Sequence, residues 1–97
     1  MREIVLFGCK DTTLHIARFL KNLDLKIQLV TISPELGASN HVAGYEDLSI
    51  NSKMFESIYV ANSYSLNDED ITAIKNINHA SLGFCVGWQR LIPKALL

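Results

Sequence analysis

The residues of this chain that could do chemistry are few and lie far apart in the sequence. Three histidines, His15, His41 and His79, and two cysteines, Cys9 and Cys85, are spread over 97 residues. Their spacing does not gather the ligands of a metal site, which needs closely spaced pairs of His or Cys. We therefore expect no metal centre and ordinary surface or capping roles for the histidines. Both thiols end apolar runs, which predicts small buried side chains rather than a disulfide framework.

Asn78, His79 and Trp88 flank one apolar run, on opposite sides. Asn78 and His79 come before the run, at the wrong end of a parallel sheet for a ligand site, because such sites lie outside the carboxyl ends of the strands. Trp88 follows the run at that carboxyl end, where an aromatic side chain can wall a ligand pocket. The other interpretation is a tryptophan that covers the edge of the sheet, and the sequence leaves both open.

Gly8 ends the first apolar run, where a glycine-rich turn would let a phosphate approach a helix. The dinucleotide-binding fingerprint would need glycines where Lys10 and Thr13 stand, and the acidic residue expected after the second strand is replaced by Ser33-Pro34. A phosphate-signalling receiver domain needs paired acids after its first strand, but only Asp11 is present. The Walker lysine pattern is missing as well.

Strands and helices alternate in the elements that must position these residues. The apolar runs 4–7 and 82–86 predict two adjacent central strands of a parallel sheet, each buried on both faces, and the segments 25–32 and 58–60 predict two more strands. Residues 33–56 have little periodicity and predict a long irregular connection with at most one short helix near 53–56. The predicted fold is therefore α/β, a Rossmann-like three-layer parallel sheet with helices on both faces.

Two helices are predicted between the strands. The first begins at the capping cluster Asp11-Thr12-Thr13 and ends near 22–24. The second follows a capping box of Ser65 and Asp68, with acidic residues in its first turn. Pro93 suits the first position of a third helix. The apolar face of the first helix is predicted to consist of Ile16, Phe19, Leu20 and Leu23.

The composition predicts one small globular domain over 1–97, with 48% hydrophobic and 20% charged residues and a net charge of −1. That charge lacks the basic footprint of a nucleic-acid-binding domain. No apolar stretch reaches the length of a membrane helix, and no signal peptide is recognisable, which predicts a cytoplasmic protein without a membrane partner. A helix from Pro93 would have about one turn of chain left, so we expect the front part of a longer, apparently truncated protein.

The last sixteen residues carry a specific resemblance. The segment Leu82-Gly83-Phe84-Cys85-Val86-Gly87-Trp88-Gln89-Arg90-Leu91-Ile92-Pro93 and the four residues after it resemble the fourth strand and following turn of the formyltransferase family. There a hydrophobic strand ends in a glycine-aromatic pair and continues into Ile/Leu-Ile/Leu-Pro. The opening Ile4-Val5-Leu6-Phe7-Gly8, and Tyr59 to Asn67 before an acidic helix, are similar to the same N-terminal layout.

The resemblance implies an enzyme that takes a formyl group from 10-formyltetrahydrofolate and passes it to a primary amine. It implies that Gly8 and Gly87 leave room for a flat ring, and that the pteridine pocket is lined by Val86, Gly87, Trp88, Leu91 and Ile92. The family's catalytic Asn-x-His motif and later aspartate are absent from this chain, which predicts a catalytically incomplete, inactive piece. Asn76-Ile77-Asn78-His79 is not equivalent, because it precedes the strand that should come before the motif.

The acceptor and the class of protein remain open. Family members that act on methionyl-tRNA usually carry a basic stretch after the second strand, where this chain has Ser33 to Asn40 without a basic residue. An amino sugar attached to a nucleotide is therefore favoured over tRNA, which is not excluded. The alternative is a non-catalytic Rossmann-like binding or interaction domain whose fourth strand and Trp88 surface dock onto a partner, with apolar groups exposed at Leu91, Ile92, Leu96 and Leu97.

Overall fold

Strands and helices alternate along the chain, as the pattern predicts. The computed structural model describes residues 3–77, 82–88, 90 and 92–96. None of the helices in these ranges is long and apolar enough to cross a membrane. The elements are β1 (Glu3–Phe7), α1 (Asp11–Asn22), β2 (Lys26–Ile32), α2 (Pro34–Ser39), η1 (Leu48–Ile50), η2 (Ser52–Met54), β3 (Ser57–Ala61), α3 (Asp68–Ile77), β4 (Leu82–Cys85) and η3 (Lys94–Leu96), where η marks a 3-10 helix.

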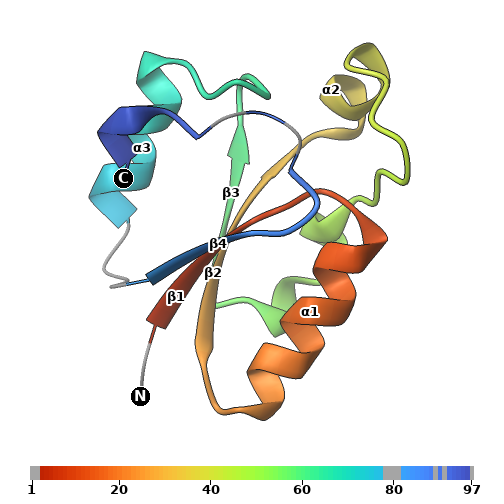
Figure 1. Ribbon diagram of the computed structural model, residues 1–97, viewed down its shortest axis with the longest axis vertical. Coiled ribbons are helices and arrows are strands. Elements are labelled where there is room, and N and C mark those ends of the chain that lie inside the picture. Colours follow the sequence, from red (N-terminus) through yellow and green to blue (C-terminus); the bar gives the residue numbers. More distant parts are fainter. Residues whose placement is uncertain (1–2, 78–81, 89, 91, 97) are drawn as a thin grey trace.

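The four strands form one sheet in the order β3-β2-β1-β4, and every neighbouring pair is parallel. Helices α1 and α3 lie on opposite sides of this sheet (Figure 1). One buried cluster, with Leu6 and Ala17, fills the space between the sheet and α1, and a second, with Val5 and Ile74, fills the space under α3. The predicted Rossmann-like α/β fold is confirmed.

Strand β1 occupies the centre of the sheet because both of its faces are apolar. Ile4 and Leu6 belong to the cluster under α1, and Val5 and Phe7 belong to the cluster under α3. All four side chains are buried. A strand that faces helices on both sides must be apolar at consecutive positions. The apolar run 4–7 therefore correctly predicted that β1 is a central strand.

Strand β4 lies beside β1 as predicted, but the expectation that it is central and covered is wrong. Leu6 pairs with Phe84 and Phe7 with Cys85, and within the described part of the chain β4 has no strand on its other side. Phe84 is 37% exposed and Cys85 is exposed too. An apolar run shows that a strand tolerates burial on both faces, but neighbouring elements decide whether it is covered. Here the buried clusters are built on β1, β2 and the end of β3.

Helix α1 has the predicted bounds but faces the sheet with a different side. Thr13 and Ala17 are its buried residues, and Leu14 and Leu20 are half-buried against the cluster beneath. The predicted inward face was chosen from the large apolar residues of the helix. The structure instead buries the small residues Thr13 and Ala17, which allow the helix to approach the sheet closely. Three of the four residues predicted to face inward are exposed: Ile16 by 38%, Phe19 by 61% and Leu23 by 57%.

The segment 33–56 contains more structure than predicted, namely α2, η1 and η2. The start of α2 follows ordinary capping chemistry, because Ser33 Oγ accepts a hydrogen bond from the Leu36 amide at 3.2 Å and Pro34 occupies the first turn. The rest of the segment is tied to the sheet by Tyr45, whose hydroxyl donates to the Ile32 carbonyl at 2.6 Å. A six-residue helix has too little periodicity to stand out in the sequence.

The cap of α3 is also two residues later than the predicted pair of Ser65 and Asp68. Asn67 Oδ1 accepts from the Asp70 amide at 2.9 Å, and the Asn67 amide donates to Asp70 Oδ2 at 3.2 Å. These reciprocal bonds form a capping box. The helix expected from Pro93 is the single 3-10 turn η3.

Candidate functional site

The strand order identifies the edge of the sheet where a ligand site is expected. From β1 the chain adds β2 and β3 on one side, and then returns to place β4 on the other side of β1. The carboxyl ends of β1 and β4 therefore flank the point where the winding reverses. In open parallel sheets ligands bind at such a point, because the connections there leave in opposite directions.

Strands β1 and β4 are joined at this point by main-chain hydrogen bonds. The Val86 amide donates to the Phe7 carbonyl at 3.0 Å, and the Cys9 amide donates to the Gly87 carbonyl at 3.2 Å. Thr13, in the first turn of α1, donates its hydroxyl to the Val86 carbonyl. The turn after β4 is thus held against both the end of β1 and the start of α1.

Gly8 and Gly87 are required by this junction for a reason that differs from the expected one. A β-carbon on Gly8 would lie 2.2 Å from Thr13 Cγ2 and 2.3 Å from the Val86 carbonyl oxygen. Gly87 has φ of +77°, and a β-carbon there would lie 2.5 Å from Thr13 Oγ1. The space that the glycines leave is filled by Thr13 and the main chain of the protein itself, not by a crevice for a ring.

Trp88 turns inward and is a core residue. Its side chain is 9% exposed, and its ring meets Phe7 and Tyr64 edge-on at centroid distances of 6.1 and 4.9 Å. The sequence left two interpretations of Trp88 open, and the structure favours the one in which Trp88 covers the edge of the sheet. The indole Nε1 is buried and has no hydrogen-bond acceptor, so one polar group at this edge is unsatisfied.

The other expected pocket residues do not gather around Trp88 on one face. Val86 is half-buried against the cluster under α1, whereas Ile92 packs against the cluster under α3, to which Trp88 belongs. Leu91 lies outside the described residues. Ile92 and Leu96 are half-buried against the core, so they are not the exposed apolar groups that the interaction-domain alternative expected.

Arg90 is a residue of this edge that the sequence did not single out. Its guanidinium carbon lies 4.9 Å from the centre of the Tyr64 ring, within the range of a cation–π contact, and Nη2 donates to Asn40 Oδ1 at 3.3 Å. Arg90 itself is exposed. Its partners come from loops 26 and 50 positions away in the sequence, so no local pattern indicates the contact.

Tyr64 is positioned by a loop that Asp70 organises. Asp70 is fully buried, and its carboxylate accepts hydrogen bonds from the Tyr59 hydroxyl at 2.6 Å and the Asn62 amide at 2.8 Å. It also accepts from the amides of Ser63 and Asn67 at 3.1 and 3.2 Å. Burial and the hydrogen bond to Asp70 raise the pKa of Tyr59 to about 12, because both favour the neutral phenol.

Neither cysteine is placed as a nucleophile, which needs a lowered pKa. Burial raises the pKa of the Cys9 thiol, although a hydrogen bond with Tyr64 and the charge of Lys10 act in the opposite direction. Desolvation raises the pKa of Cys85 as well. Cys9 is buried as predicted, whereas Cys85 is exposed, and both are free thiols.

Two of the three histidines, His15 and His41, lie in the described part of the chain. His15 and His41 are exposed, and Asn78 and His79 lie outside the described residues. Within the ranges that the structure describes, no group of three or more His, Cys, Asp or Glu side chains could hold a metal ion.

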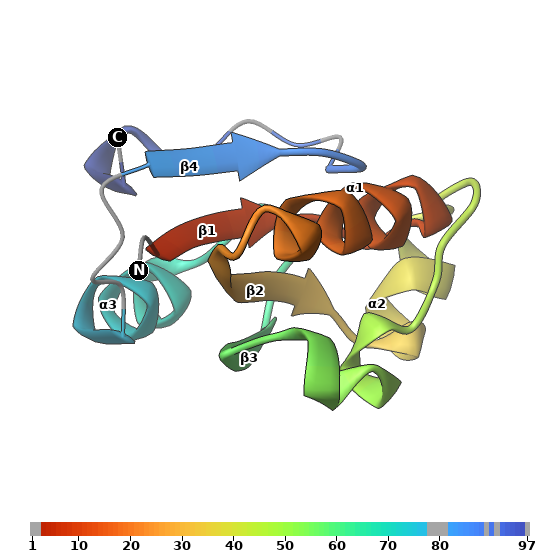
Figure 2. The same cartoon turned by 90° about the horizontal axis from the view of Figure 1, so that it is seen from below.

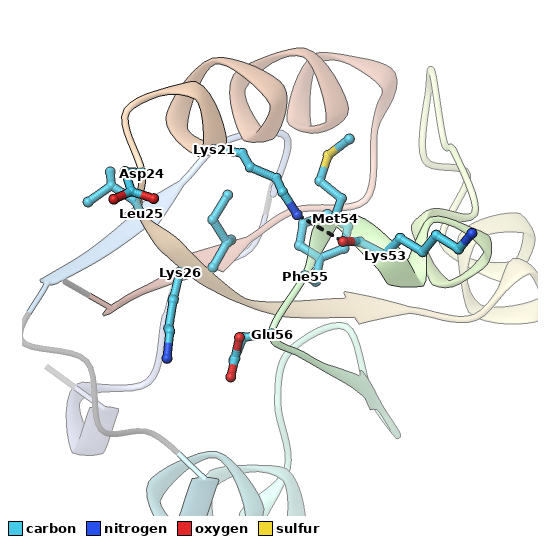
Figure 3. Close-up of a pocket in the computed structure, with 9 residues that line it drawn as sticks. Lys21, Asp24, Leu25, Lys26, Lys53, Met54, Phe55 and Glu56 are labelled. Carbon is cyan, nitrogen blue, oxygen red and sulfur yellow. Dashed lines mark hydrogen bonds between the residues drawn. The ribbon is translucent and has the colours of Figure 1, made fainter. Parts of the chain in front are cut away.

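A separate cavity of about 290 Å³ lies at the opposite end of the sheet, where β2 begins (Figure 3). Lys21 reaches across it from α1 and donates from Nζ to the Lys53 carbonyl oxygen at 2.9 Å. Three lysines and two acids share its lining, so it has no strong charge of one sign, and amino ends of parallel strands are not where such sheets bind ligands. The lining residues are Lys21, Asp24, Leu25, Lys26, Ile27, Lys53, Met54, Phe55 and Glu56.

Comparisons with protein-family models, curated proteins and solved structures found no significant match to this chain. The candidate site is the carboxyl edge between β1 and β4, with the residues that follow these strands.

Proposed function

We propose that this chain is the folate-side, N-terminal part of a formyltransferase-like enzyme of the cytoplasm, and that it holds 10-formyltetrahydrofolate at the carboxyl edge of β1 and β4. One observation carries the proposal. The segment that resembles the family begins with β4, and β4 ends beside β1 at the reversal of the sheet, where parallel sheets bind ligands.

One unsatisfied polar group at this edge supports a polar heterocycle as the ligand. Trp88 Nε1 is a buried donor without an acceptor, and a pteridine ring carries a carbonyl oxygen and ring nitrogens that accept hydrogen bonds. Leaving such a donor unsatisfied costs about 1 to 3 kcal/mol, which a bound acceptor would recover. The family resemblance assigns Val86, Gly87, Leu91 and Ile92 to the same pocket.

The chemistry proposed for the whole enzyme is acyl transfer. A neutral primary amine attacks the formyl carbon, and the oxyanion that forms needs hydrogen-bond donors. The family supplies these from an Asn-x-His motif and an aspartate that this chain does not contain. The chain would bind the formyl donor but not complete the transfer.

The amine acceptor that we favour is an amino sugar attached to a nucleotide. The segment after β2 forms α2, and from Ser33 to Asn40 it contains one charged residue, the acidic Glu35. A tRNA acceptor would need basic groups near this edge to meet its phosphates. Arg90 and Lys10 are positive groups on the same edge of the sheet, but two separate cations suit a small anion better than a phosphate backbone.

The experiment is calorimetric titration of the chain with 5-formyltetrahydrofolate, a stable analogue of the formyl donor. Trp88→Phe keeps a ring in the core and removes the N–H, so we expect binding to weaken by about 1 to 3 kcal/mol. The control is Phe19→Leu, since Phe19 is exposed on α1. No binding by the unmodified chain would refute the proposal, whereas unchanged affinity with a lower melting temperature would make Trp88 a core residue only.

A second candidate function is a non-catalytic interaction domain. The observation that favours it is the open outer side of β4, with Phe84 and Cys85 exposed. In that function the fourth strand, rather than the inward-facing Trp88, would meet the partner.

A further inference from the structure

The indole nitrogen of Trp88, the donor that the proposed function assigns to the ligand, is closed off in this structure. Nε1 is buried and has no acceptor. A hydrogen bond brings the acceptor to about 3 Å from the donor, along the direction of the N–H. A ligand atom is no smaller than a water oxygen, so it reaches a buried Nε1 only after a neighbouring side chain has moved. Binding through this donor therefore requires an open form of the site.

The two aromatic neighbours of Trp88 are held to different degrees. Phe7, whose ring centroid lies 6.1 Å from that of the indole, belongs to β1, which pairs with a strand on each side. Tyr64, at 4.9 Å, belongs to the loop between β3 and α3. In the same loop Leu66 has a φ of 61°, a strained conformation for a residue other than glycine. The Tyr64 side of the indole is therefore the side that can open.

Arg90 holds Tyr64 in the closed position. Its guanidinium carbon lies 4.9 Å from the centre of the Tyr64 ring, and its Nη2 donates to Asn40 Oδ1 at 3.3 Å. Asn40 ends α2, which lies at the carboxyl end of the sheet (Figure 2). Its Nδ2 donates to the Leu36 carbonyl at 2.8 Å, so α2 fixes the amide that Arg90 binds. We call the two contacts of Arg90, with Tyr64 and with Asn40, the Arg90 latch.

We propose that the Arg90 latch controls access to Trp88, and that Arg90 is a positioning residue for the ligand. This inference rests on the proposed function, because it concerns the donor that we assign to the folate. In the open form Arg90 leaves the Tyr64 ring, Tyr64 moves away from the indole, and Nε1 becomes accessible. The ring of the ligand then takes the place of Tyr64 beside Trp88.

The strengths of these contacts allow a ligand to open the latch. An exposed cation–π contact contributes roughly two- to fivefold to an equilibrium constant. Arg90 is exposed, so its hydrogen bond to Asn40 competes with water and adds little. An acceptor that satisfies a buried donor contributes roughly fivefold to a hundredfold. The ligand thus gains more than the latch contributes and selects the open form, although the closed fraction lowers its apparent affinity.

The first test needs no ligand. Trp88 is the single tryptophan of the chain, so quenching of its fluorescence by acrylamide measures how accessible the site is. Arg90→Gln removes the cation and should raise the quenching constant about twofold or more, because the closed form loses the cation–π contact. Arg90→Lys keeps a cation and should restore most of the protection. The matched control is Arg18→Gln, which changes an exposed arginine on α1 and should leave quenching unchanged.

The second test is calorimetric titration of the same variants with 5-formyltetrahydrofolate. Arg90→Gln should bind this folate about two- to fivefold more tightly than the unmodified chain, because a larger fraction of the molecules is open. Arg18→Gln should bind it as the unmodified chain does. A purely structural role of Arg90 predicts the opposite sign, since a loosened site binds its ligand more weakly.

The two tests also separate the latch from the proposed function. Equal quenching in Arg90→Gln and Arg18→Gln would overturn the latch, whether or not the chain binds the folate. Higher quenching in Arg90→Gln without folate binding by any variant would support the latch and refute the proposed function. Higher quenching with weaker folate binding would make Arg90 a direct contact of the ligand and overturn its role as a latch.

Discussion

Asp70 shows how a single buried carboxylate can organise an edge of this sheet. A buried charge is costly unless hydrogen bonds replace the water that it loses. Asp70 accepts from three main-chain amides and from the Tyr59 hydroxyl. These bonds hold the loop between β3 and α3 in place, and that loop brings Tyr64 against Trp88.

The pKa of Tyr59 yields a prediction at the scale of one residue. Its pKa is raised from an ordinary value of 10.0 to about 12 in the folded chain. The folded state therefore holds this proton more tightly than the unfolded state, and the stabilisation is complete below about pH 10 and lost as the pH rises towards 12. We expect the free energy of unfolding to fall over this window and to fall less steeply in Tyr59→Phe.

Urea denaturation at about pH 9 and about pH 11 measures this difference. Tyr45, whose pKa is also raised to about 12, remains in the variant and keeps its own part of the slope. Equal slopes in Tyr59→Phe and in the unmodified chain would contradict the assignment to Tyr59.

At the scale of the elements, β1, α1 and β4 meet at a junction that a single buried side chain, Thr13, holds together. Thr13 is fully buried in the first turn of α1, where its hydroxyl donates to the Val86 carbonyl and accepts from the Lys10 amide at 3.3 Å. One side chain thus joins the helix to the turn after the edge strand. The glycines at 8 and 87 make room for it.

Thr13→Val should therefore loosen the junction. Valine has the same shape but leaves the Val86 carbonyl without its donor, which costs about 1 to 3 kcal/mol of the free energy of unfolding. Chemical denaturation measures the loss. Thr12→Val is the matched control, because Thr12 is exposed and bonds through its amide alone, and it should change stability by about 0.5 kcal/mol or less. Equal losses in both variants would show that Thr13 Oγ1 adds nothing.

At the scale of the whole molecule, the candidate binding site lies at one edge of the sheet, the carboxyl edge of β1 and β4. The four strands supply the reversal point between β1 and β4. The cysteines have raised pKa values, and the family's Asn-x-His motif does not occur in the sequence. We therefore expect this chain to bind the formyl donor without catalysing the transfer.

We accordingly expect the chain to bind 5-formyltetrahydrofolate and to show no formyl transfer from 10-formyltetrahydrofolate to an amino-sugar nucleotide. The measurement is the formation of tetrahydrofolate over time at a high protein concentration. A complete formyltransferase in the same assay is the positive control. Turnover by this chain would contradict the prediction and place catalytic groups within its 97 residues.

Local patterns were enough to predict the order and approximate bounds of the main elements. Consecutive apolar residues at 4–7 indicated a strand covered on both faces, and acidic residues before Ile71 indicated the start of a helix. These signals depend on neighbours within about four positions, which share a face or a turn. The same signals predicted that β1 and β4 lie side by side, since both are apolar runs of a parallel sheet.

Only the tertiary structure decided which of these apolar residues are covered. The run that forms β4 has the composition of a central strand, but β4 is the outer strand of the described sheet, and its Phe84 and Cys85 are exposed. Three further features could not be predicted from the sequence: the flank of α1 that faces the sheet, the inward orientation of Trp88, and the contact between Arg90 and Asn40. Each depends on the packing of segments far apart in the sequence, and burial is a property of that packing rather than of residue type.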